Sequence, residues 1–231
     1  MSLIFVTSSG TDIGKTVVSS LLLAQLKAKG RQVTALKPVL SGTEGVPLDE
    51  TDTGRLLQAV GVPVTEASFK AATPWAFKEP LSPDMAAARE GATLCLDELT
   101  EFCVAPENQD HILVEGAGGV LVPINETATM ADWMLALKAR AELKVLLVVG
   151  SYLGTISHTL SAMESLRARG LGPSAIVIST SQVNPVPVEE TIRVMKRFVD
   201  GVPIVAIPRL NGNGSASMEN GAVPDLTSCV E

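Results

Sequence analysis

The residues best suited to chemistry lie in a glycine-rich stretch near the start of the chain, TSSGTDIGKT at residues 7–16. It follows a short apolar run and precedes an amphipathic segment, so backbone N–H groups at a helix N-terminus can surround a phosphate. In such a pattern Lys15 neutralises phosphate charge, and the Thr16 hydroxyl can hold Mg²⁺. Gly14 lets the backbone approach without a Cβ in the way. The stretch therefore predicts a phosphate-binding P-loop.

The spacing departs from the usual P-loop pattern at one position. The pattern G-x-x-x-x-G-K-T requires its first glycine where this chain has Ser9. An ordinary glycine-rich turn that caps a helix is the alternative interpretation. The strand pattern before the stretch and the helix pattern after it favour phosphate binding.

Two later segments can bring charged groups to the same place. Lys37 ends a second apolar run and is followed by PVLSG, and Glu115 ends the run HILVE before GAGG. Because the carboxyl ends of parallel strands share one edge of a sheet, Lys37 can face the phosphate loop. A carboxylate beside Thr16 suits an oxygen-rich Mg²⁺ site.

Each of these segments also has a simpler interpretation. Lys37 alone could be a solvated lysine before a turn-forming proline. The glycines at 116–119 could begin a dinucleotide fingerprint, although the third glycine is misplaced for one. The acids Asp49, Glu50 and Asp52 could simply supply favourable charge to the first turn of a helix.

Short β-branched runs alternate along the chain with helix-like stretches, which predicts an α/β fold. We expect a doubly wound, mostly parallel sheet flanked by helices, of the P-loop NTPase type, in one domain spanning 1–231. Asn, Gly and Ser crowd residues 211–220, so the tail 211–231 is expected to be flexible. The predicted strands are 3–7, 32–36, 111–114, 145–149, 175–178 and 204–207, and the predicted helices are 16–29, 52–60, 83–91, 130–139, 155–169 and 188–199.

Composition excludes several other classes of protein. The 231 residues contain 18 Lys+Arg and 25 Asp+Glu, a formal net charge of −7, which argues against a nucleic-acid-binding surface. No apolar stretch approaches the roughly 20 residues of a membrane span, and no signal peptide is readable, so we expect a cytoplasmic protein without a membrane partner. The cysteines 95, 103 and 229 form no Cys-x-x-Cys pair, which argues against structural zinc or a disulfide framework.

Together the motifs resemble those of the dethiobiotin synthetases, the ATP-dependent carboxylases of biotin synthesis, over nearly all of residues 3–210. Two positions depart from that family. Asp12 stands where many members have Glu, and Ser179-Thr180 stands where an Asn that reads adenine is expected. The likeness rests on GTDIGKT at 10–16, KPV at 37–39 with SG at 41–42, TD at 51–52, SP at 82–83, VEGAGG at 114–119, ADW at 131–133, VG at 149–150, Gly154 with His158, and IP at 207–208.

The resemblance implies a reaction of 7,8-diaminopelargonate, CO₂ and ATP with Mg²⁺ as cofactor. One amine captures CO₂ as a carbamate, ATP phosphorylates the carbamate, and the second amine displaces phosphate to close a cyclic urea. A carbamate and a triphosphate repel each other, so cations must gather where the phosphoryl group moves.

The resemblance also assigns roles to individual residues. It implies a homodimer in which the neighbouring subunit holds the distal carboxylate of the substrate. The catalytic residues are Lys37, Lys15, Thr11 and Ser41; the ATP-binding residues are Asp12, Ile13, Gly14, Lys15, Thr16, Val17, Glu115, Gly118, Ser179, Pro208, Arg209 and Leu210; the substrate-binding residues are Ser41, Gly150, Leu153 and Gly154; and the metal ligands are Thr16, Asp52 and Glu115.

Two other activities on the same architecture stay open. A partition-type regulatory ATPase shares the phosphate loop, but such switches carry a signature lysine where this chain has Gly10. A small-molecule kinase has no evident need for the Lys37 and Ser41 loop beside a Glu115 loop. Fold alone does not separate these activities.

Overall fold

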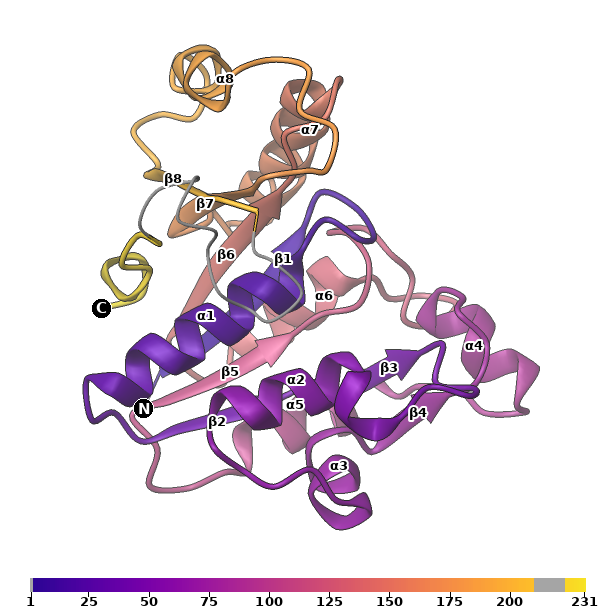
Figure 1. Ribbon diagram of the computed structural model, residues 1–231. Helices are drawn as coiled ribbons and strands as arrows, with labels where there is room; N and C mark the ends of the chain where they lie inside the picture. Colours follow the sequence, from indigo (N-terminus) through magenta and orange to yellow (C-terminus); the bar gives the residue numbers. More distant parts are fainter. Residues whose placement is uncertain (1, 210–222) are drawn as a thin grey trace.

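The computed structural model describes residues 2–209 and 223–231, and in them six parallel strands form one sheet in the order β2-β5-β1-β6-β7-β8 (Figure 1). Helices cover both faces, so the predicted doubly wound α/β fold is confirmed. The elements are β1 Ser2–Ser8, α1 Lys15–Ala28, β2 Val33–Leu36, β3 Val39–Ser41, η1 Leu48–Glu50, α2 Asp52–Ala59, α3 Glu66–Ala72, β4 Trp75–Phe77, α4 Pro83–Arg89, α5 Leu96–Val104, β5 His111–Glu115, α6 Met130–Lys138, β6 Leu143–Val149, α7 Thr155–Arg167, β7 Ala175–Ser179, α8 Val188–Met195, β8 Ile204–Ile207 and η3 Thr227–Cys229.

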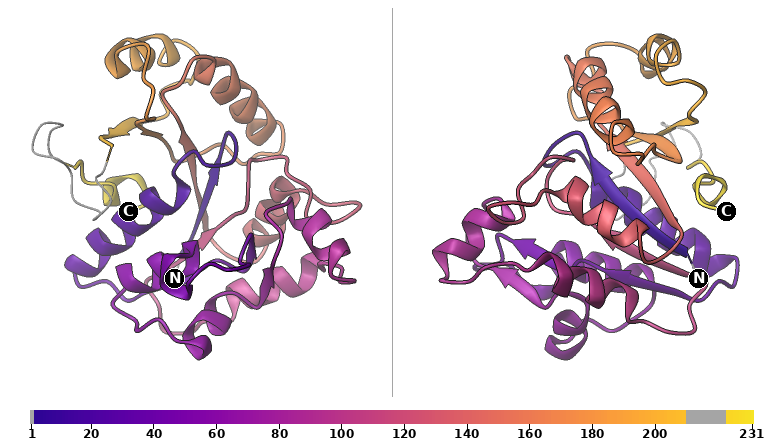
Figure 2. Two further views of the ribbon diagram at one scale, coloured as in Figure 1. Left: turned by 45° about the vertical axis from the view of Figure 1, so that its right-hand side comes forward. Right: turned by 180° about the vertical axis from the view of Figure 1, so that it is seen from behind.

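Strand β1 lies in the middle of the sheet, between β5 and β6. Its residues from Leu3 to Val6 are fully buried, as expected for an apolar run covered on both faces. Successive side chains point to opposite faces: Ile4 joins the cluster under α1 and α2, whereas Phe5 meets Trp133 of α6 edge to face, with ring centroids 5.2 Å apart. Figure 2 shows the helices on the two faces of the sheet in a view turned by 45° and in a view from behind.

A second, two-stranded sheet was not expected from the sequence. Strand β3 pairs in parallel with β4, with Val39 opposite Trp75 and Ser41 opposite Phe77. Each strand is only three residues long, too short for a periodic signal, and their pairing depends on a contact between distant segments. The short sheet matters because it places Ser41 beside the end of β2. Helices α3 and α5 were also missed.

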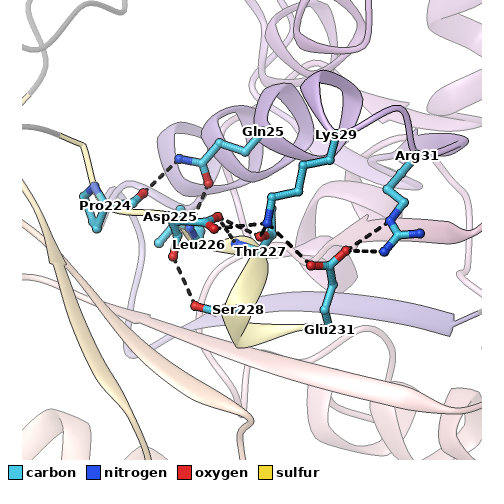
Figure 3. Close-up of polar contacts among 9 residues, drawn as sticks. All are labelled: Gln25, Lys29, Arg31, Pro224, Asp225, Leu226, Thr227, Ser228 and Glu231. Atoms are coloured by element: carbon cyan, nitrogen blue, oxygen red, sulfur yellow. Dashed lines mark hydrogen bonds and ion pairs between the residues drawn. The ribbon is translucent and has the colours of Figure 1, made fainter.

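The structure describes part of the tail 211–231, whose flexibility stays a prediction. Residues 210–222 lie outside the described residues. Residues 223–231 pack against α1, where Leu226 is fully buried and Val230 nearly so. The side-chain amide of Gln25 donates to the carbonyl of Pro224 at 2.8 Å and accepts from the N–H of Leu226 at 2.8 Å (Figure 3).

Ion pairs hold the same segment at the end of α1. Lys29 Nζ lies 3.1 Å from Asp225 Oδ2, and Arg31 Nη2 lies 2.7 Å from Glu231 Oε1 (Figure 3). These pairs are exposed and contribute little by themselves. The buried apolar contacts therefore account for most of the docking, and a composition rich in Gly and Ser earlier in the tail gave no hint of them.

Within residues 2–209 and 223–231, none of the helices combines the length and apolar character needed to cross a bilayer.

Replacing Leu226 by Ala should lower the free energy of unfolding by about 3 kcal/mol, because the side chain is fully buried against α1. Urea denaturation of the purified protein measures this loss. The matched control is Leu135→Ala on α6, where the side chain is 45% exposed and the loss should be much smaller. Equal losses in the two variants would show that residues 223–231 do not dock in solution.

Candidate active site

A cavity of about 550 Å³ opens at the carboxyl edge of the sheet, beside the loop that joins β1 to α1. Residues from five segments line it. The cavity brings together most of the residues predicted from the sequence: Thr11, Asp12, Ile13, Gly14, Lys15, Thr16, Val17, Lys37, Ser41, Asp52 and Gly118.

The loop over residues 9–14 has the geometry of an anion site. Gly14 adopts φ +101° and begins α1, so it brings no side chain to cap the helix, and the first N–H groups of the helix stay available to a ligand. A Cβ at Gly14 would lie 2.4 Å from the Oγ of Ser179. Only glycine suits this position, for its backbone angle and for its space.

Lys15 lies over this loop. Its Nζ donates to Ser8 Oγ at 3.1 Å and to the carbonyl of Gly10 at 3.5 Å. Burial and then repulsion from Lys37 lower the pKa of Lys15 to about 8, although Glu115 opposes the shift. The ammonium is thus poorly compensated, and an anion in the loop would stabilise it.

The predicted metal ligands meet at one point. Thr16 Oγ1 lies 2.8 Å from Asp52 Oδ1 and 2.9 Å from Glu115 Oε1. Lys37 Nζ donates to Glu115 Oε1 at 2.8 Å and lies 3.3 Å from Asp52 Oδ2. Lys37 also donates to the carbonyl of Gly116 at 3.0 Å.

Neighbouring charges decide the electrostatics of this cluster. Glu115 is fully buried and Lys37 is 3% exposed. Burial lowers the pKa of Lys37, but the carboxylates of Glu115 and Asp52 outweigh burial, so its pKa lies above the ordinary value. Burial raises the pKa of Asp52, but Lys37 and the Thr16 hydroxyl outweigh it and leave that pKa lowered. Lys37 and Asp52 are therefore both charged at neutral pH.

One oxygen of the cluster favours a cation. Glu115 Oε2 is buried and has no hydrogen-bond partner among the described residues. A carboxylate oxygen left in this way costs free energy unless a donor or a metal reaches it. With Thr16 and Asp52 beside it, the donor set is all oxygen, which suits Mg²⁺.

Ser41 and Thr11 both line the cavity. Ser41 ends β3, and its hydroxyl donates to the carbonyl of Leu81 at 2.7 Å, so its lone pairs can accept from an amine. Thr11 is exposed in the phosphate loop. Both hydroxyls therefore border the space in which a substrate would lie.

The residues predicted for the distal carboxylate lie elsewhere in the chain. Leu153 and Gly154 line a second cavity of about 670 Å³ between α7 and α8, and Gly150 begins the turn that leads to it. Gly154 begins α7 at φ +96°, and Leu153 is 82% exposed. One chain alone does not bring these residues to the phosphate loop.

The residues predicted to lie near the base follow β7 and β8. Ser179 packs against Gly14, and the carbonyl of Ile207 accepts hydrogen bonds from the N–H and the hydroxyl of Thr180. Pro208 and Arg209 follow β8 directly, and Leu210 lies outside the described residues.

Several cavity residues were missed by sequence reasoning. Arg55 lines the cavity from α2, and residues 80–83 line it as well. Ser8 orients Lys15 from the end of β1. The Ser82-Pro83 pair is one motif of the family resemblance, which assigned it no role in the cavity. The one available signal for Arg55 was its position one helical turn after Asp52.

Known proteins resemble this chain in sequence and in fold. A family described as "AAA domain" matches residues 2–212. Solved structures with similar folds include the septum site-determining protein MinD of Pyrococcus horikoshii (TM-score 0.52, 18% identity, 91% of this chain and 82% of that one) and a ParA family ATPase of Chlorobium tepidum (0.51, 10%, 91% and 85%). At such low identity they share the fold alone, so they do not favour a regulatory ATPase.

Sequence relatives are more specific. ATP-dependent dethiobiotin synthetases match from Acidiphilium cryptum (44% identical, 88% of this chain, 91% of the relative), Caulobacter sp. strain K31 (44%, 97% and 94%) and Bacillus subtilis subsp. natto (36%, 89% and 87%). The matches span 88 to 97% of this chain. The chain therefore belongs to the ATP-dependent dethiobiotin synthetases, which are ligases of biotin biosynthesis.

Proposed function

We propose that the chain joins CO₂ to 7,8-diaminopelargonate and closes the ring of dethiobiotin, through a carbamate and a carbamic-phosphoric anhydride, with release of ADP and phosphate. The observation that carries the proposal is the buried contact of Lys37 with Glu115 and Asp52, next to Thr16 of the phosphate loop. A cation and two acids in one cluster support a reaction in which a phosphoryl group moves between two anions.

The chain's own residues would hold and orient the reactants. Backbone N–H groups of the loop and Lys15 would surround the inner phosphates, and Lys37 would neutralise the carbamate. Thr11 and Ser41 line the same cavity and would hydrogen-bond to carbamate or amine. No nucleophilic side chain is needed, because the amine and the carbamate are themselves the nucleophiles.

Mg²⁺ fits the cluster as a cofactor. Thr16, Asp52 and Glu115 would hold it, and Glu115 Oε2 is the oxygen without a protein partner among the described residues. When bound, the ion neutralises phosphate charge during transfer.

The remaining predicted contacts belong to a dimer and to the base. The N–H groups of residues 152–154, just before α7, donate to no acceptor among the described residues and would bind a distal carboxylate. The exposure of this turn suits a neighbouring subunit's cavity. The base would lie near Ser179, Pro208, Arg209 and Leu210. Backbone edges can read a base, so the expected Asn is not essential for binding.

Incubation with ATP, Mg²⁺, bicarbonate and 7,8-diaminopelargonate should yield dethiobiotin and phosphate, measured by mass spectrometry and a phosphate assay. Omission of any one component should abolish the cyclic urea. Phosphate release that ignores the diamine, with no cyclic urea, would instead support a nucleotide switch.

Replacing Lys37 by Ala should lower kcat by about 100-fold, corresponding to about 3 kcal/mol of lost transition-state stabilisation. ATP affinity should change little, because Lys15 and the loop N–H groups hold the inner phosphates. Steady-state turnover and calorimetric titration with ATP measure the two effects. Unchanged turnover would remove Lys37 from the mechanism.

Replacing Glu115 by Gln should weaken Mg²⁺-dependent ATP binding, because one charged oxygen ligand becomes a neutral amide. Titration with Mg²⁺ at a constant ATP concentration measures the shift. The control is Glu79→Gln, an exposed acid whose described partner is Arg89. Equal magnesium dependence in native protein and Glu115→Gln would assign Glu115 a structural role only.

A further inference from the structure

Arg55 is a cationic side chain of the cavity that the mechanism above does not use. It lies in α2, one turn after Asp52, and lines the same cavity as Lys15, Thr16 and Lys37. Its backbone N–H donates to the carbonyl of Thr51 at 3.0 Å. Across residues 2–209 and 223–231 its guanidinium makes neither an ion pair nor a hydrogen bond.

The bound reactants need a further cation in the cavity, because Lys37 and Lys15 already have partners in the protein. Lys37 is already matched by Glu115 and Asp52, and Asp12 adds a further negative charge. Lys15 is engaged with Ser8 at the base of the loop. A nucleotide triphosphate and a carbamate would bring several more negative charges. The guanidinium of Arg55, which has no acceptor among the described residues, is well placed to bind one of these anions.

We propose that Arg55 binds the outermost phosphoryl group of ATP and keeps hold of that group as it passes to the carbamate. This assignment rests on the proposed function and adds a phosphate-binding residue to it. A guanidinium presents paired N–H groups that match two oxygens of a phosphoryl group. Asp52, a proposed metal ligand, and Arg55 both lie in α2, so the helix keeps their spacing constant.

Position in the fold selects the outer phosphoryl group over other anions. The inner phosphates have the loop N–H groups and Lys15 as donors. The distal carboxylate of the substrate has a separate candidate site at the start of α7. Arg55 lines the cavity together with Asp52 and Thr16, which are in contact with each other.

The test compares Arg55→Ala, Arg55→Lys and the control Arg197→Ala, an exposed arginine beyond α8. Calorimetry in the presence of Mg²⁺ and the absence of diamine gives the Kd of the β,γ-imido analogue of ATP and the Kd of ADP. For Arg55→Ala we expect the Kd of the analogue to rise about tenfold and that of ADP to rise less than about twofold. Arg55→Lys should recover part of the lost affinity for the analogue. The control Arg197→Ala should leave both Kd values unchanged.

The side chain is exposed, so thermal unfolding should be the same in all three variants; Arg55→Gln repeats the comparison if the alanine variant is unstable. Equal changes for the analogue and ADP, or no change, would overturn the proposal. A raised KM for the diamine with unchanged analogue binding would overturn it too. If native protein forms no dethiobiotin but the variants separate the analogue from ADP, the Arg55 assignment stands while the proposed reaction fails.

Discussion

The buried ion pair between Lys37 and Glu115 is the interaction on which the site depends. Both charges are buried, so each depends on the opposite charge of the other for much of its stability. Their contact follows from the pairing of β2 with β5, in which Leu36 lies opposite Val114, so the next residue of each strand reaches the carboxyl edge together. A register shift by one residue would turn one of the two side chains to the other face. The register of these two strands therefore brings the two charged groups of the site together.

The central position of β1 connects this pair to the phosphate loop. Val6 lies opposite Glu115 in the neighbouring strand β5, and the chain continues from Ser8 into the loop. Glycines let these segments approach closely: a Cβ at Gly119 would lie 3.3 Å from the backbone N of Gly10. Thr16 at the start of α1 thus meets Asp52 of α2 and Glu115 of β5, although the three residues are far apart in the chain.

The same architecture serves different proteins, so the fold alone does not define the activity. The fold is shared with a MinD protein and a ParA family ATPase at 18% and 10% identity. What separates this chain from a general phosphate-loop protein is the Lys37 segment, supported by the short β3–β4 sheet, facing the Glu115 segment. The exposed turn at the start of α7 is the other distinctive part, and it lies apart from the chain's own cavity.

Local sequence determined the phosphate loop, the alternation of strands and helices, and the type of group at Lys37, Asp52 and Glu115. These features follow from glycine position, apolar periodicity and side-chain chemistry, which are properties of short segments. Only the tertiary structure decided that Arg55 faces the cavity, that Ser41 is held by the β3–β4 pairing, and that residues 223–231 dock on α1. Each of these depends on contacts between segments distant in the chain, whose free energy comes from burial and pairing that no local pattern records.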